Sequence, residues 1–147
     1  ITGAIIEKFL SAEAQPSLIV LLVQKEVGER IARDKKESIL SLSVKAYGDP
    51  QYIQTVPRSA FSPPPTVDSA ILRITDISRK NFQNKEQERK FFELVRAGFA
   101  HKRKLLKRNL EGVVGKGYSD ILKNNGIPEN ARAEDVPLWQ WLKLAED

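Results

Sequence analysis

The sequence predicts an α/β fold followed by a small all-helical part. Residues 18–23 form a continuously apolar, partly β-branched run, which is typical of a strand that a parallel sheet buries on both faces. Two more β-rich segments follow at residues 51–56 and 67–74. From residue 91 onward, apolar residues recur at helical spacing instead. Three strands leave the apolar strand short of neighbours, so we expect further strands outside this chain.

The first fifty residues should contain three short helices around the apolar strand. Thr2 can cap the first helix, in which four apolar residues share a face. These are Ile5, Ile6, Phe9 and Leu10. The other two helices are expected at about residues 25–33 and 38–46, and a turn at residues 48–50 leads into the second strand.

A stiff connector should join the second and third strands. Pro63, Pro64 and Pro65 cannot pair in a sheet, because proline lacks an amide hydrogen and its φ is fixed. Phe61 stands at the head of this segment and is held at low entropic cost. A rigid aromatic ring at a sheet edge can stack on a flipped base. The alternative is that Phe61 belongs to the core and the prolines only turn the chain.

The polar segment 77–90 is the expected linker between an α/β part, residues 1–76, and a helical part, residues 91–147. The helical part begins with an apolar stripe. It consists of Phe91, Phe92, Leu94, Val95, Phe99, Leu105, Leu106 and Leu110. Lys102 falls inside the stripe, so either its stem snorkels or the helix breaks near His101. Further on, Asp135 can cap a last helix.

Composition limits the classes of protein and site. Of the 147 residues, 41% are apolar and 29% are charged, and no apolar run approaches the roughly 18 residues of a membrane-spanning helix. We therefore expect no membrane association. Because there is no cysteine and only one histidine, His101, neither thiol catalysis nor a metal site is expected. The chain begins at Ile1 and contains no methionine, so we expect it to be a piece of a longer protein.

Six cations lie in one acid-free segment, residues 95–110, while the rest of the chain is nearly neutral. They are Arg96, Lys102, Arg103, Lys104, Lys107 and Arg108. Cations on one helical face, backed by apolar residues, can lie along a phosphate backbone, and the pattern predicts a nucleic-acid contact. The alternative is a solvated helix face, although such faces usually mix both signs of charge. A membrane surface is disfavoured, since the segment lacks an exposed apolar flank.

Lys25 and Glu26 directly follow the apolar strand. Residues at the carboxyl ends of strands in open α/β sheets face the ligand crevice, which makes Lys25 a candidate nucleic-acid contact. The same residues equally suit an ordinary first helical turn, in which the helix dipole favours Glu26. No glycine-rich phosphate loop follows a strand, so no cofactor ligand is assigned in this chain.

Three short blocks follow one another along the chain. They are Val-Gln-Lys-Glu-Val at residues 23–27, Phe-Ser-Pro-Pro-Pro-Thr-Val-Asp-Ser-Ala at residues 61–70, and Phe-Ala-His-Lys-Arg-Lys at residues 99–104 with Asn109 and Leu110. Each block alone is weak, but the three in this order and spacing are specific. Together they resemble the ribosomal RNA adenine dimethyltransferases of the KsgA type, and the resemblance covers nearly the whole chain.

The resemblance implies the C-terminal portion of a Rossmann-like sheet from an S-adenosylmethionine-dependent methyltransferase, followed by a helical RNA-binding domain. The full-length enzyme would dimethylate two adjacent adenines of small-subunit ribosomal RNA during ribosome assembly, as a cytoplasmic monomer. Phe61 would stack on the target adenine, and the six cations with Lys25 would contact RNA. The ligands of S-adenosylmethionine would precede Ile1, so this chain alone should be inactive.

Two other functions stay open. The macrolide-resistance methyltransferases share the Phe-x-Pro-x-Pro-x-Val block, although the basic run at residues 101–104 and the Asn109-Leu110 pair are more similar to the KsgA branch. The second alternative is a non-catalytic module that binds RNA or the ribosome.

Overall fold

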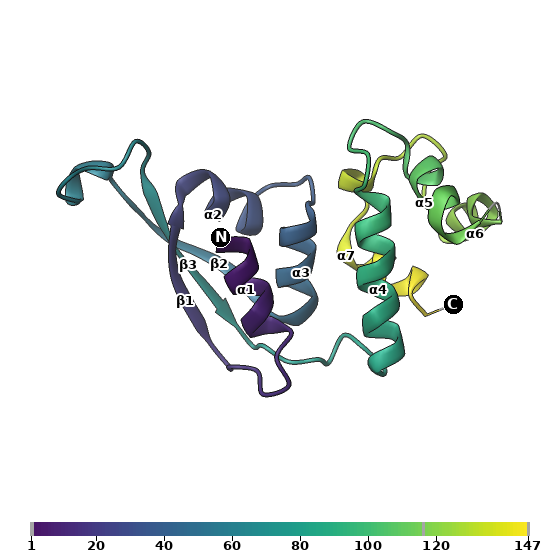
Figure 1. Ribbon diagram of the computed structural model, residues 1–147, viewed down its shortest axis with the longest axis horizontal. Coiled ribbons are helices and arrows are strands. Elements are labelled where there is room, and N and C mark those ends of the chain that lie inside the picture. Colours follow the sequence, from purple (N-terminus) through teal and green to yellow (C-terminus); the bar gives the residue numbers. More distant parts are fainter. Residues whose placement is uncertain (1, 116, 147) are drawn as a thin grey trace. The chain divides into compact units, whose positions relative to one another are not determined.

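The computed structural model describes residues 2–115 and 117–146, apart from the side chains of residues 113 and 114. The chain divides into two compact units, which are coloured along the sequence in Figure 1. Unit 1 comprises Ile1–Lys35 and Leu40–Arg79. Unit 2 comprises Lys36–Ile39 and Lys80–Asp147, so it includes a short segment that unit 1 encloses in sequence. The expected domain limits at residues 76 and 91 stay predictions.

A three-stranded sheet is the centre of unit 1. Its strands are β1 (Ile19–Gln24), β2 (Asp49–Val56) and β3 (Ser69–Thr75), in the order β1-β3-β2. The middle strand β3 runs antiparallel to both neighbours, and a register shift lies between Tyr52 and Gln54. On β3, alternate residues from Ala70 to Ile74 are buried, so one face of the sheet forms the core of this unit.

The strand expected at residues 18–23 is present as β1, but within this chain it is not covered on both faces. It pairs antiparallel with β3, and only alternate side chains are buried. Ile19 and Val23 face the core, whereas Val20 and Leu22 are 56% and 53% exposed. This alternation could not be predicted from the sequence, because every residue of the run is apolar, whichever face of the strand it lies on.

Three helices lie on the same side of the sheet in Figure 1. They are α1 (Thr2–Leu10), α2 (Lys25–Ala32) and α3 (Ile39–Tyr47). Helix α2 contacts all three strands, and a Cβ on its Gly28 would lie 3.0 Å from the Cβ of Ala70, so glycine permits this close approach. In α1 only Ile6 and Leu10 are buried, whereas Ile5 and Phe9 are 44% and 52% exposed, so the four apolar residues do not bury one common face within this chain.

Unit 2 consists mainly of helices. They are α4 (Lys85–Gly98), α5 (Leu106–Val114), α6 (Tyr118–Asn124) and α7 (Leu138–Leu144), with the 3₁₀ turn η2 (Ala133–Asp135) before α7. Helix α4 begins within the expected linker, because the Asn84 side chain caps it by accepting a hydrogen bond from the Gln87 amide at 2.8 Å. No helix in the described part of the chain is both long and apolar enough to cross a membrane.

The core of unit 2 is organised around Trp141, which is fully buried on α7. A Cβ on Gly98 would lie 2.6 Å from the Trp141 ring, so the end of α4 can approach this ring only as glycine. The ring of Phe99 stacks on the indole with a centroid separation of 6.0 Å. Asp135 lies in η2 and does not cap α7, whose N-cap is Pro137, so that expectation is wrong.

Candidate nucleic-acid interface

The connector between β2 and β3 extends beyond the ends of its strands (Figure 1). It contains the 3₁₀ turn η1 (Arg58–Ala60), then Phe61 and the proline run, which begins with a cis peptide bond between Ser62 and Pro63. The backbone amide of Phe61 donates to the carbonyl of Arg58 at 3.2 Å. Phe61 is half-buried, while the residues on either side of it are exposed. The ring is thus neither a core residue nor freely exposed.

The two ends of the connector are tied together and to the end of β1. The backbone amide of Arg58 donates to the Asp68 carboxylate at 2.8 Å. The amide of Lys25, the first residue of α2, donates to the Asp68 carbonyl at 2.9 Å. Lys25 is far from the connector along the chain, but the fold brings its backbone to the end of the connector at Asp68. The side chain of Lys25 is exposed there.

An open hollow of about 520 Å³ lies at this junction. It is lined by charged and small polar side chains together with Val67: Lys25, Glu26, Glu29, Arg58, Thr66, Val67 and Asp68. Lys25 and Arg58 supply two cations there, and Glu26, Glu29 and Asp68 supply three acids. This mixed lining can hold a group that carries a charge and also forms hydrogen bonds. Phe61 is not among the residues that line the hollow.

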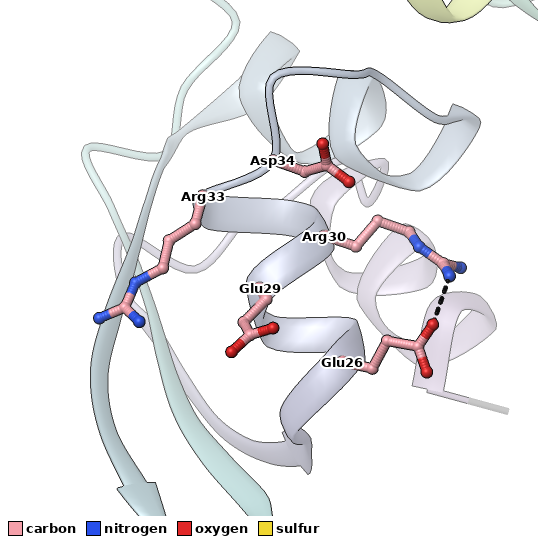
Figure 2. Close-up of a pocket in the computed structure, with 5 residues that line it drawn as sticks. All are labelled: Glu26, Glu29, Arg30, Arg33 and Asp34. Atoms are coloured by element: carbon pink, nitrogen blue, oxygen red, sulfur yellow. Dashed lines mark hydrogen bonds and ion pairs between the residues drawn. The ribbon is translucent and has the colours of Figure 1, made fainter.

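The outer surface of α2 continues as a second hollow, of about 280 Å³, shown in Figure 2. Glu26 and Arg30 form an exposed ion pair at 3.0 Å, and Arg33 extends away from them, its guanidinium 3.8 Å from the centre of the Tyr52 ring. The arginines here are thus engaged within unit 1, which makes this surface a solvated helix face. No cluster of three or more metal-binding side chains occurs among the described residues.

The basic segment forms a turn between two helices, residues 99–105, which we name the cationic turn. Helix α4 ends at Gly98 and α5 begins at Leu106, so the alternative of a helix break near His101 is confirmed. The side chains of Lys102, Arg103 and Lys104 are exposed in this turn, and that of Arg108 is exposed in the first turn of α5. These four form no ion pair with any residue that the structure describes.

The other two predicted cations have partners. Lys107 is only 22% exposed and pairs with Glu129 at 3.1 Å, which holds the pKa of the Glu129 carboxyl below its usual value. The guanidinium carbon of Arg96 lies 5.7 Å from the centre of the Phe92 ring, at the end of α4. A polyanion would therefore meet the three cations of the turn and Arg108 with the least competition.

Two residues that sequence reasoning left without a role support the cationic turn. The Asn109 side chain donates to the carbonyls of Gly98 and His101 at 2.8 and 3.0 Å. Arg132 donates from Nε to the carbonyl of Arg103 at 3.3 Å. Asn109 carries a signal in the sequence, because it is the one amide side chain among residues 101–110. Arg132, in contrast, is too distant in sequence to have been found.

Comparison with known proteins gives one consistent family. The model of the ribosomal RNA adenine dimethylase family matches residues 1–147. Ribosomal RNA small subunit methyltransferase A of Dehalococcoides mccartyi (strain ATCC BAA-2266 / KCTC 15142 / 195) is 40% identical over 148 residues, covering 98% of this chain and 50% of that protein. Its counterpart in Nostoc sp. (strain PCC 7120 / SAG 25.82 / UTEX 2576) is 42% identical over 154 residues, covering 99% and 56%. The chain thus spans about half the length of these relatives.

Two solved structures share the fold. A dimethyladenosine transferase from Plasmodium falciparum superposes with a TM-score of 0.80 at 24% identity, over 98% of this chain and 61% of that one. The 23S rRNA methyltransferase ErmE superposes with a TM-score of 0.74 at 24% identity, over 99% and 60%. These likenesses confirm the α/β fold class, and the family match confirms the resemblance drawn from the three blocks. The chain belongs to the ribosomal RNA adenine dimethylase family.

Proposed function

We propose that the protein containing this chain is an S-adenosylmethionine-dependent methyltransferase that dimethylates two adjacent adenines of small-subunit ribosomal RNA. This chain would supply its C-terminal part, which holds the RNA and stacks the target base. The observation that carries the proposal is the family match along all 147 residues. The relatives at 40% and 42% identity are named as small-subunit methyltransferases, which supports this target over large-subunit RNA.

Unit 2 would act as a helical RNA-binding domain, with the cationic turn as its main contact. Lys102, Arg103, Lys104 and Arg108 are exposed and form no ion pair within the described residues, so binding phosphates breaks no existing pair. Each cation that neutralises a phosphate releases counterions, which favours binding at low salt. Lys107 and Arg96 would contribute less, because each already interacts with a neighbour.

In unit 1, Phe61 would stack on the extruded adenine. Its half-buried ring stands on a connector that is closed at its base by the bond from Arg58 to Asp68, so little freedom remains to be lost on stacking. Lys25, exposed beside the same junction, would contact a phosphate of the flanking RNA. Extrusion is needed because the amine of a stacked base is out of reach.

S-adenosylmethionine would supply the methyl group, but the described residues offer no recognisable cradle for it. A glycine-rich turn after a strand is the usual feature, whereas the described glycines with positive φ, Gly115 and Gly126, both follow helices in unit 2. Since the relatives are about twice as long as this chain, we assign the cofactor site to the remainder of the protein. This chain alone should then be inactive, and its residues orient the adenine amine and exclude water.

A methylation assay on the full-length protein tests the proposal. With S-adenosylmethionine carrying a labelled methyl group, we expect label in two adjacent adenines of unmethylated small-subunit RNA and none in large-subunit RNA. Label in large-subunit RNA would favour the macrolide-resistance type of enzyme. RNA binding without methyl transfer would favour a non-catalytic module. A monomeric state and a cytoplasmic location stay predictions, to be checked by light scattering and by cell fractionation.

A further inference from the structure

The buried side chain of Asn109 connects the end of α4 to the cationic turn. Its Nδ2 donates to the carbonyl of Gly98, the last residue of α4, and to that of His101 within the turn. Both partners are carbonyl oxygens, which can only accept, so the amide nitrogen must be the atom that faces them. Asn109 is only 6% exposed, and its bond to the Gly98 carbonyl is buried, whereas its bond to the His101 carbonyl is part-buried.

The oxygen of the same amide, Asn109 Oδ1, indicates why an asparagine stands at this position. Asn109 Oδ1 is buried and has no hydrogen-bond partner among the described residues, which costs stability. An apolar residue of similar size would avoid this cost, but the buried Gly98 carbonyl would lose the Asn109 donor, and the His101 carbonyl would keep only the Lys104 amide, which donates to it at 3.0 Å. The benefit of asparagine at this position therefore lies in the backbone path of the turn.

Further bonds hold the turn along its length. Arg132 Nε donates to the carbonyl of Arg103, and the amide of Leu106 donates to the carbonyl of Ala131 at 2.9 Å. The carbonyls of His101 and Arg103 are thus engaged by protein donors, while the charged side chains of the turn remain exposed. A backbone oxygen carries partial negative charge, so engaging it inside the protein leaves a surface that offers a polyanion mainly cations.

We propose that Asn109 is a positioning residue for RNA binding. It fixes the backbone of the cationic turn so that Lys102, Arg103 and Lys104 are presented together to a phosphate backbone. A turn held in this way loses less conformational entropy when RNA binds than a free loop does. The inference rests on the proposed function, because it assigns a role within the RNA-binding surface of unit 2.

The test measures RNA affinity as a function of salt with the full-length protein. The probe is a fluorescently labelled RNA with the sequence of the 3′ end of small-subunit ribosomal RNA. Asn109→Ala removes both donors, and Asn109→Ser keeps one hydroxyl donor. Asn125→Ala is the matched control, since Asn125 Nδ2 donates to the carbonyl of Ile121 at 2.8 Å in the same unit, but at the C-cap of α6. Thermal unfolding of each variant is recorded in parallel.

We expect Asn109→Ala to weaken binding about tenfold at low salt and to flatten the log–log salt slope by about one, because fewer cations reach phosphates together. Asn109→Ser should lie between this variant and the unaltered protein, and Asn125→Ala should keep the unaltered slope. If Asn109→Ala does not fold, Asn109→Ser carries the same test with a smaller expected shift.

Three results would overturn the inference. The first is unaltered affinity and slope in the folded Asn109 variants. The second is an equal loss of slope in Asn125→Ala, which would assign the effect to general destabilisation of unit 2. The third is an unaltered protein that shows no salt-dependent RNA binding, and that result alone would overturn the proposed function as well.

Discussion

Asp68 closes the connector that carries Phe61 by accepting a hydrogen bond from the backbone amide of Arg58 at 2.8 Å. The two residues are ten apart in sequence, so this bond joins the start of the connector to the start of β3. The carbonyl of Asp68 also accepts from the amide of Lys25. One aspartate therefore joins the end of β1 to both ends of the connector, and the position of Phe61 should depend on it.

Replacing Asp68 should impair methylation by the full-length enzyme without removing a reacting group. We expect Asp68→Ala to lower kcat/KM about tenfold, because the connector opens at its base and the ring is misplaced. Asp68→Asn keeps a carbonyl oxygen that can accept the Arg58 bond and should retain most of the activity. Steady-state methyl incorporation measures both. Equal impairment in the two variants would contradict the role of this bond.

Replacing Phe61 tests the stacking itself. Phe61→Ala should lower methylation at least about tenfold, since stacking is worth about 1–3 kcal/mol per base, whereas Phe61→Tyr should stay near the unaltered rate. Thermal unfolding of both variants separates loss of stacking from loss of structure, because Phe61 is half-buried. Unaltered turnover in Phe61→Ala would show that the ring is only part of the fold.

Arg108 and Lys107 are neighbours in sequence that should respond differently. Arg108 is exposed, whereas Lys107 pairs with Glu129 at 3.1 Å. We expect Arg108→Ala to reduce the salt slope of RNA binding by about 0.7, and Lys107→Ala to reduce it less. The unaltered slope should be about −3 if four cations contact single-stranded RNA. Equal effects of both substitutions would show that the ion pair opens on binding.

Two glycines of unit 2 should respond to alanine with opposite signs. At Gly98 a Cβ would lie 2.6 Å from the Trp141 ring and 2.9 Å from Leu106 Cδ1, so Gly98→Ala should lower the unfolding free energy by about 1–3 kcal/mol. At Gly112, in α5, nothing lies within 4 Å, and Gly112→Ala should raise it by about 0.5–1 kcal/mol. Denaturant titration measures both, and a stabilised Gly98→Ala would contradict this packing.

Asp135 should make the stability of unit 2 depend on pH. Its carboxylate binds Lys36 and accepts from the Arg132 amide at 3.0 Å, which holds its pKa below the ordinary 3.8. The stabilisation is therefore complete above pH 3.8 and is lost as the pH falls through the depressed pKa. Asp135→Asn should lower the unfolding free energy at pH 7, with a difference that shrinks in acid. A difference that is constant with pH would contradict this linkage.

The order of elements could be predicted from sequence because each depends on local periodicity. The three strands and the break near His101 follow from such patterns. The antiparallel pairing of β1 with β3 could not be predicted, because an apolar run does not indicate which strand it pairs with or in which direction. The start of α4 at Lys85 was missed since its signal is a single capping residue, Asn84, in a charged segment that otherwise suggests a linker.

The sequence indicated which cations to consider for the candidate site, but it did not indicate the residues that support them. Charged side chains are mostly exposed, so a basic run indicates candidate contacts, and four of its six cations are exposed with neither an ion pair nor a ring contact among the described residues. The supports depend on contacts that the fold creates, such as that of Arg132 with the Arg103 carbonyl, 29 residues away. The partner of Lys107 was missed for the same reason, because Glu129 approaches it from a distant loop.

In the cationic turn, the residues that would touch RNA and the residues that fix the backbone are different. Lys102, Arg103 and Lys104 expose their side chains, while Asn109 and Gly98 are buried behind them. Mutation of the exposed positions should therefore be nearly free of folding cost. The charge of the turn, and with it the preference for an RNA, can therefore be changed by substitution without disturbing the helices that carry the turn.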